Sequence, residues 1–318
     1  MAIIKNPTIV IGGGGAPSGM YALEFVSDSD TFGYVYITQG ESIKNNPFDM
    51  AKIGYAFIGW STTQGGSTIS YPYTPSEDLT LYAVWLSVTP KASLSDYTWG
   101  EIKQLADLVA NQILSASDLS NTYNIAIGDT KSSTINGETH SYRLIGLRHD
   151  VDASDNYLGM TFEQVDLMAN AMKLVNYGSS SASWDNSNLK TTINAFTIAS
   201  DLDAVITAAK KPCAYSVSSG TPLTYVTTKL WIESQTEVFN RQGDTIGGTV
   251  EGSQYQYYAN GGSKIKQLSG SNNFWWLRSP NGWNSNYYYS FFCGVASNGS
   301  ESTSNGSNSQ GVAPCFCI

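Results

Sequence analysis

Charged residues are scarce in this sequence, at 14% of 318 residues against a typical ~25%. The 17 Lys and Arg against 26 Asp and Glu give a net charge of −9. No basic stripe occurs, so nucleic acid and anionic membranes are poor partners. No window approaches the ~18 uninterrupted apolar residues of a transmembrane helix, and we therefore expect no membrane insertion.

Cysteine and histidine are rare as well. Four cysteines are too few for a disulfide scaffold, and the two histidines are His140 and His149. The first twenty residues hold only a four-residue apolar run before four glycines, which is too short for the core of a signal peptide. We therefore expect no export signal. A virion protein, which assembles in the host cytoplasm, would not need one.

Apolar residues make up 41% of the chain and aromatic residues 12%, which is enough to bury a sizeable core. A prior of roughly 150 residues per domain predicts two domains. The glycine run at 12–15 does not match a dinucleotide fingerprint, because Pro17 or Ser18 stands at its third glycine. We predict an N-terminal attachment segment at 1–30, a strand-rich spacer at 31–86, a linker at 87–96 and a second domain at 97–318.

Short strands separated by Gly- and Pro-rich turns are predicted in the spacer at 34–37, 55–58 and 79–85. The pair Gly59-Trp60, then Gly65-Gly66 and the closing run Leu81-Tyr-Ala-Val-Trp85, resemble the Listeria–Bacteroides surface repeat of the internalin B-repeat family. That resemblance implies a small β-grasp-like module that acts as a spacer in surface proteins.

The second domain mixes predicted helices with strands at both of its ends, which indicates an α+β fold. Capping patterns predict helices that start at Thr98-x-x-Glu101, at Thr161-x-x-Gln164 (running to Met172) and at Ser200-x-x-Asp203 (ended by Pro212). Strands are predicted at 123–128, 142–147, 229–233, 274–277, 288–293 and 311–318.

Residues 281–310 are rich in Asn, Ser, Tyr and Gly, and Glu301 is their only charged residue. Alone, such a stretch predicts a disordered linker, but both of its flanks are apolar and the chain ends in Phe316-Cys-Ile318. We therefore expect a displayed segment that is held at both ends by the core. Tyr with Ser, Gly and Asn is the composition of antibody-like contact surfaces. Asn codons also become Tyr, Ser or Thr codons when only their adenines change.

The segment Trp275-Trp-Leu-Arg-Ser-Pro280, the polar stretch and Gly311-Val-Ala-Pro-Cys-Phe-Cys-Ile318 resemble variable proteins of diversity-generating retroelements. Residues 142–150, 230–238 and 251–257 resemble that group too. The resemblance implies a C-type-lectin fold whose C-terminal variable region binds ligand, as in phage tropism determinants. Ala313 stands where the family usually has Arg, which puts any ion pair of that Arg in doubt.

Within the polar stretch, residues 291–295 predict a strand between two exposed segments. Alternate residues of a strand face opposite ways, so members such as Tyr288 could instead point into the core. The expected ligand contacts are Trp283, Asn284, Asn286, Tyr287, Tyr288, Tyr289, Ser290, Ser300, Ser302, Thr303, Ser304, Asn305, Ser307 and Asn308.

Enzymatic alternatives rest on few residues. His149-Asp150 lacks an accompanying nucleophile motif, and Cys315-x-Cys317 lacks the paired spacing of zinc sites. We expect buried thiols and no cofactor. The acidic run at 150–156 lacks EF-hand spacing, so a solvated loop is expected there. Lectin-fold relatives include formylglycine-generating oxidases that use paired cysteines, and an oxidase therefore stays open as an alternative.

Together these patterns predict a non-enzymatic, hypervariable receptor-binding protein on a phage tail tip or encoded by a prophage. Its partner would be a protein or glycan on a target cell. An adhesin on a bacterial surface stays open as the alternative setting, and the oligomeric state stays open as well.

Overall fold

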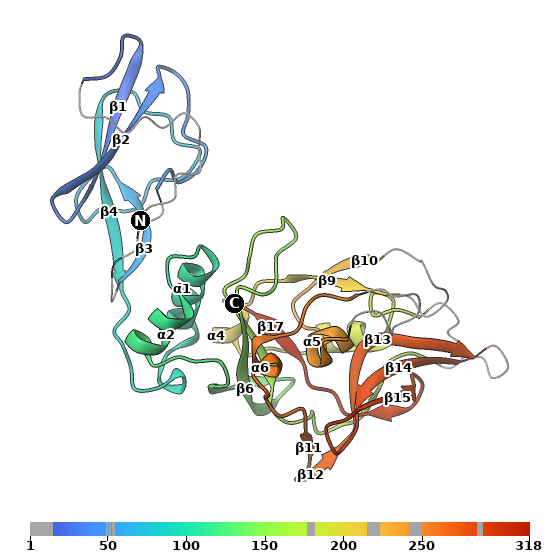
Figure 1. Ribbon diagram of the computed structural model, residues 1–318. Coiled ribbons are helices and arrows are strands. Elements are labelled where there is room, and N and C mark those ends of the chain that lie inside the picture. The colour runs from blue at the N-terminus through green and yellow to red at the C-terminus, as the bar shows by residue number, and fades with distance from the viewer. Residues whose placement is uncertain are drawn as a thin grey trace. The chain divides into compact units, whose positions relative to one another are not determined.

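The computed structural model describes residues 15–48, 50, 52, 55–176, 182–214, 223–241, 250–284 and 289–318. For residues 56, 86, 87, 282–284 and 289 it describes the backbone alone. The chain divides into two compact units (Figure 1). The first takes the chain up to Pro90 together with Asn111–Leu114, and the second takes the rest. In the part of the chain that is described, no helix is long and apolar enough to cross a membrane.

The first unit is built on one four-stranded sheet with the order β2-β1-β4-β3. β1 and β4 run parallel, and the other two pairs are antiparallel. The strands are β1 Met20–Ser27, β2 Asp30–Thr38, β3 Tyr55–Ser61 and β4 Leu79–Ser87. The three strands that the sequence predicted in this region are confirmed.

An aromatic cluster forms the core of the first unit. The Trp60 ring is fully buried and packs edge-on against Phe25, with the ring centroids 4.7 Å apart. Its Nε1 donates to Asn46 Oδ1 at 2.9 Å. Gly59 has a φ of +141°, and an added Cβ would lie 2.9 Å from the Thr68 side chain. The Gly-Trp pair therefore combines a backbone bulge that favours glycine with the main core residue.

The predicted attachment segment was drawn too long. Residues 1–30 were assigned to it, but β1 lies at the centre of the sheet between β2 and β4. Leu23 and Phe25 alternate with more exposed neighbours and are fully buried, which is the period of a strand that has one face on a core. The glycine-rich stretch before β1 led the sequence-based prediction to assign this short alternating strand to the attachment segment.

The second unit contains short helices and several small sheets (Figure 1). α1 begins with the predicted capping box: Glu101 N donates to Thr98 Oγ1 at 3.2 Å, and Thr98 N donates to Glu101 Oε2 at 2.7 Å. The helices are the 3-10 turn Leu94–Asp96, α1 Trp99–Ala110, α2 Ala116–Tyr123, α3 Asn188–Asn194, α4 Ser200–Asp203, α5 Gln235–Phe239 and α6 Gln256–Ala259.

The largest sheet of this unit has the order β17-β7-β6-β5 and is antiparallel throughout. Its strands are β5 Thr130–Ile135, β6 Glu138–Leu147, β7 Met160–Gln164 and β17 Cys315–Cys317. The smaller sheets pair β8 Met172–Lys173 with β16 Ser309–Gln310, β9 Ala209–Cys213 with β10 Thr224–Thr228, β11 Lys266–Leu268 with β12 Ser271–Asn273, and β14 Tyr289–Val295 with both β13 Trp275–Asn284 and β15 Glu301–Asn305.

The chain end lies in the core, as the sequence predicted. Every residue of 311–318 is buried. β17 pairs with β7 on one edge, and Trp231 and Thr207 bridge to it on the other. Phe316 stacks on Phe162 with the ring centroids 5.5 Å apart. The last residues therefore form part of a central strand rather than a tail.

Several predicted elements of the second unit were wrong. Residues 161–164 form the buried strand β7 and not a helix start, because neighbouring strands pair with both edges of β7. Pro212 lies inside β9, and α4 ends at Asp203. Tyr123 ends α2 rather than starting a strand, and 229–233 contribute one bridge, at Trp231. Capping patterns with three-residue spacing also occur in strands and loops, so the pattern alone was insufficient.

Candidate functional site

The sheet β13-β14-β15 carries the polar stretch. β14 is its central strand and is antiparallel to both neighbours. Cys293 and Val295 of β14 are fully buried in one cluster with Trp275 and Leu277 of β13. Gly294 leaves no space for a larger residue, since an added Cβ would lie 2.1 Å from the Phe274 ring. The predicted strand within the stretch is confirmed, and it forms part of the core.

Two Asn-Gly-Ser turns shape the second half of the stretch. Asn298 Oδ1 accepts from Ser300 N at 3.0 Å and from Ser300 Oγ at 2.7 Å. Asn305 Oδ1 accepts from Ser307 N and Ser307 Oγ, both at 3.0 Å. These contacts are Asx turns, in which the Asn side chain closes the backbone turn. The two turns flank the edge strand β15.

The expected contact residues differ in their exposure. In the second segment Ser300, Thr303 and Asn308 are exposed, and Ser302, Asn305 and Ser307 are half-buried. Ser304 and Ser290 are 9% and 1% exposed and do not face solvent, so their assignment as contacts is corrected. Of the first segment, Asn286, Tyr287 and Tyr288 lie outside the described residues, and Trp283, Asn284 and Tyr289 are described by backbone alone.

The single charge of the stretch is neutralised locally. Glu301 Oε2 pairs with Arg241 Nη2 at 2.8 Å. Ser304, in contrast, is an internal acceptor, because its Oγ lies 3.1 Å from both Asn308 Nδ2 and Gln310 Nε2. The exposed face of β15 and its two turns therefore presents hydroxyl and amide groups without a net charge.

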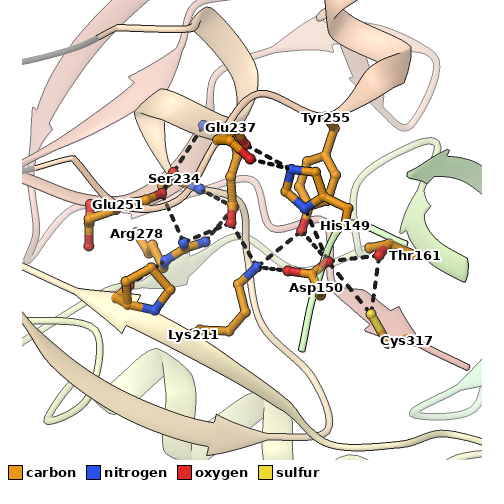
Figure 2. Close-up of polar contacts among 12 residues, drawn as sticks. His149, Asp150, Thr161, Lys211, Ser234, Glu237, Glu251, Tyr255, Arg278 and Cys317 are labelled. Carbon is orange, nitrogen blue, oxygen red and sulfur yellow. Dashed lines mark hydrogen bonds and ion pairs between the residues drawn. The ribbon is translucent and has the colours of Figure 1, made fainter. Parts of the chain in front are cut away.

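A buried ionic network anchors β13 of this sheet (Figure 2). Arg278 is fully buried and binds the Glu237 carboxylate with both terminal nitrogens, at 2.5 and 2.9 Å. Arg278 also donates to the backbone oxygens of Ile232 and Pro212. Glu237 is at the same time the capping residue of α5, since its Oε2 accepts from Ser234 N at 2.9 Å.

Lys211 extends the network from β9 (Figure 2). Its ammonium lies 2.7 Å from Glu237 Oε1, 2.5 Å from Asp150 Oδ1 and 3.1 Å from the Tyr255 hydroxyl. Asp150 Oδ2 in turn accepts from Thr161 Oγ1 at 2.7 Å and from the Tyr255 hydroxyl at 3.0 Å. The two positive charges, of Arg278 and Lys211, thus balance the two carboxylates of Glu237 and Asp150 in the interior.

The electrostatics of this network follow from burial and pairing. Burial by itself would raise the pKa of Asp150, but the Lys211 ammonium outweighs it and holds that pKa well below its usual value. Glu237 has a lowered pKa because Arg278 and Lys211 overcome its desolvation. Burial instead raises the pKa of Glu251, against the opposing charge of Arg278. The four central groups are therefore charged at neutral pH.

A second ionic cluster lies around Glu163 of β7. Glu163 Oε1 accepts from Arg143 Nε at 2.9 Å, and its Oε2 lies 2.8 Å from Lys266 Nζ. Tyr258 donates to Oε2 at 2.6 Å. Against its desolvation, these two cations lower the pKa of Glu163 to about 2. Burial, followed by the charge of Glu163, raises the pKa of Glu233 well above its usual value.

The enzymatic candidates are placed in the same interior. Cys315 and Cys317 are free and fully buried, and burial raises the pKa of both thiols well above the usual value. Among the described residues, no group of three or more His, Cys, Asp and Glu side chains is placed to hold a metal ion. In the acidic run, Asp152 Oδ1 accepts from Ser154 N and Asn156 N, so Asp152 closes a turn. Asp150 is buried and not solvated, which corrects that part of the loop prediction.

The ionic network was missed at the level of the sequence. Its signals were the Ser234-x-x-Glu237 capping pattern and an arginine, Arg278, that directly follows the apolar run Trp275-Trp-Leu277. Neither signal identifies its partner, because Glu237 and Arg278 are 41 residues apart in the chain and Asp150 and Tyr255 are 105 residues apart. Only the fold brings them together.

Two parts of the chain match known families. Residues 21–84 match the Listeria-Bacteroides repeat domain, which confirms the resemblance stated for the first module. Residues 162–318 match a domain of unknown function, DUF6273. No curated protein matches the chain.

Proposed function

We propose that the second unit is a non-enzymatic ligand-binding domain that displays residues 281–310 as a hypervariable receptor-binding surface. In this proposal the domain has a C-type-lectin-like fold, is diversified by a retroelement and is carried on a phage or prophage virion. The repeat domain would act as a β-grasp-like spacer. The partner would be a protein or glycan on a target cell.

The observation that carries this proposal is the separation of surface from core within one short segment. Strand β14 buries Phe292, Cys293 and Val295 in the core. Arg278 anchors the neighbouring strand β13, and Thr303 and the two Asn-Gly-Ser turns lie at the edge. Substitutions at exposed polar positions leave such a core unchanged, since surface replacements typically alter stability by ~0.5 kcal/mol or less. A surface of this kind tolerates diversity.

The oxidase alternative is disfavoured by the same geometry. Cys315 and Cys317 are 0% exposed, and both thiols are held in the protonated form. The thiolate is the reactive form of cysteine, and reactive cysteines are partly exposed. An oxidase would need both thiols to reach a substrate.

A bacterial surface adhesin is the second candidate. The repeat domain at 21–84 favours it, because repeats of this family act as spacers in surface proteins. The neighbouring genes distinguish the two settings. Structural genes of a virion tail support the phage assignment, whereas a chromosomal locus without phage genes supports the adhesin.

Binding of the fluorescently labelled full chain to a panel of bacterial strains, read by flow cytometry, tests the proposal. We expect binding to a subset of strains. Replacing Tyr287, Tyr288 and Tyr289 together by Ala should reduce that binding at least about tenfold, because aromatic side chains dominate such contacts. The melting temperature should stay unchanged.

The matched control replaces Tyr55 and Tyr157 by Ala. These tyrosines are 37% and 45% exposed and lie outside residues 281–310. This variant should bind like the parent protein. The proposal is wrong if no strain binds, if the control loses binding equally, or if the triple variant unfolds.

A further inference from the structure

A pocket of about 340 Å³ opens beside the ionic network. It lies between the segment 149–155, the strands β9 and β10, and residues 250–253, and all of its lining residues come from outside 281–310. Its volume is within the ~300–1,000 Å³ of small-molecule sites. It is therefore separate in composition from the proposed receptor-binding surface.

The buried charges that form the floor of this pocket balance only together with Arg278, which pairs with Glu237 from outside the pocket lining. Asp150, Lys211 and Glu237 line it, and Lys211 donates to Asp150, Glu237 and the Tyr255 hydroxyl. An ammonium has three hydrogens to donate, so these partners use all of them. The floor thus has no spare cation for an anionic ligand, and its carboxylates are already paired.

The rim combines an exposed aromatic ring with an ion pair. The Tyr225 side chain is 59% exposed. Lys210 Nζ lies 5.3 Å from the centroid of that ring and 2.7 Å from Asp155 Oδ1. Lys210 retains donors and Asp155 retains acceptors beyond this pair. A flat apolar surface therefore stands beside hydrogen-bonding groups whose charges cancel.

The histidine of the pocket lies between Ser253 and Asp150. His149 Nε2 lies 3.0 Å from Ser253 O and 3.1 Å from Ser253 Oγ. His149 Nδ1 is buried and makes no hydrogen bond within the described part of the chain, although Asp150 Oδ2 is 3.5 Å away. Against the burial of Asp150, the imidazole also helps to hold the pKa of that carboxyl well below its usual value, after the larger effect of Lys211, so it links Ser253 at the pocket wall to the buried carboxylate.

We propose that this pocket binds a neutral pyranose unit of a glycan. A pyranose has an apolar face of C–H groups, which suits the Tyr225 ring, and a rim of hydroxyls that both donate and accept. Those hydroxyls match the mixed donors and acceptors of Asp155, Lys210 and Ser253. An ionic ligand gains little here, because each charge of the pocket already has a partner.

Saturation-transfer NMR of the full chain with the methyl glycosides of glucose, galactose, mannose and N-acetylglucosamine tests this assignment. At least one glycoside should receive saturation. Tyr225→Ala should weaken its binding about tenfold or more, and Tyr225→Phe should keep it within about threefold, because the ring face provides the contact. Lys210→Met should also weaken it.

The matched control is Tyr157→Ala, which removes a tyrosine of similar exposure that does not line the pocket. It should leave glycoside binding unchanged, and all variants should keep the parent circular dichroism spectrum. The assignment is overturned if none of the four glycosides binds, if Tyr225→Ala binds as the parent does, or if glucuronate or glucosamine binds more tightly than the neutral sugars.

Discussion

Replacing Glu237 by Gln tests whether the buried ionic network holds the second unit together. The Glu237 carboxylate contacts Arg278 twice, Lys211 once and the backbone N–H of Ser234 once. A glutamine has nearly the same shape, but it offers one accepting oxygen and turns an amide N–H₂ towards the cations. Asp150 would then be the remaining counter-charge for both of them.

The expected cost is large relative to the stability of a domain. Arg278, Lys211 and Glu237 are each 1% exposed or less, so water cannot compensate the lost charge. Removing one partner of a buried ion pair costs about 3–5 kcal/mol, against a total of about 5–15 kcal/mol for a typical domain. We therefore expect Glu237→Gln to remove a large fraction of the free energy of unfolding of the second unit.

Urea titration of the full chain is the assay, with hydrogen exchange of β6 and β7 as the readout, so that the first unit does not contribute to the signal. The control is Asp203→Asn, which breaks the Lys229–Asp203 pair, whose side chains are both 47% exposed. Exposed pairs contribute about 0–1 kcal/mol. The reasoning is refuted if Glu237→Gln costs less than about 1 kcal/mol, or no more than the control.

Three further outcomes are expected. The pKa of Glu233 is raised in the folded state, so its stabilising effect is complete below the usual glutamate pKa and is lost as pH rises. The Glu233→Gln variant should therefore have a higher melting temperature than the parent at pH 8 and the same melting temperature at pH 4.5. The opposite order would contradict the assignment. Removing residues 315–318 should unfold the second unit in circular dichroism, since losing a buried Phe316 alone costs about 3–5 kcal/mol; a truncated chain that stays folded would make this end dispensable. A fragment of residues 87–318 should fold, because it retains Lys91, whose N–H donates to the Tyr97 hydroxyl at 2.8 Å; loss of its near-ultraviolet circular dichroism would show that the two units share a core.

Local signals in the sequence predicted local structure well. The strands of the repeat module, the capping box at Thr98 and the buried chain end all follow from patterns within about ten residues. The same kind of signal failed at 161–164, because Thr-x-x-Gln also fits the strand β7, where partners on both edges decide the conformation. Long-range pairing overrides local preference there.

Composition predicted a displayed polar segment but could not rank its residues. Ser304 and Thr303 are neighbours of similar chemistry, yet one is an internal acceptor and the other is exposed. Strand register decides this, and register depends on pairing with β14. The two Asn-Gly-Ser segments led to no turn prediction from the sequence, although both close turns in the fold.

Deep sequencing of the gene segment that encodes residues 275–318, in a population of the cells or phages that carry it, tests the central claim most directly. The account predicts substitutions at adenine-containing codons within 281–310, including those of the exposed residues Ser300, Thr303 and Asn308. A template repeat differing at adenines should lie beside a reverse-transcriptase gene. Codons of the buried residues Trp275 and Arg278 should stay constant. Substitutions spread evenly across 275–318, or an invariant stretch at 281–310, would contradict the account.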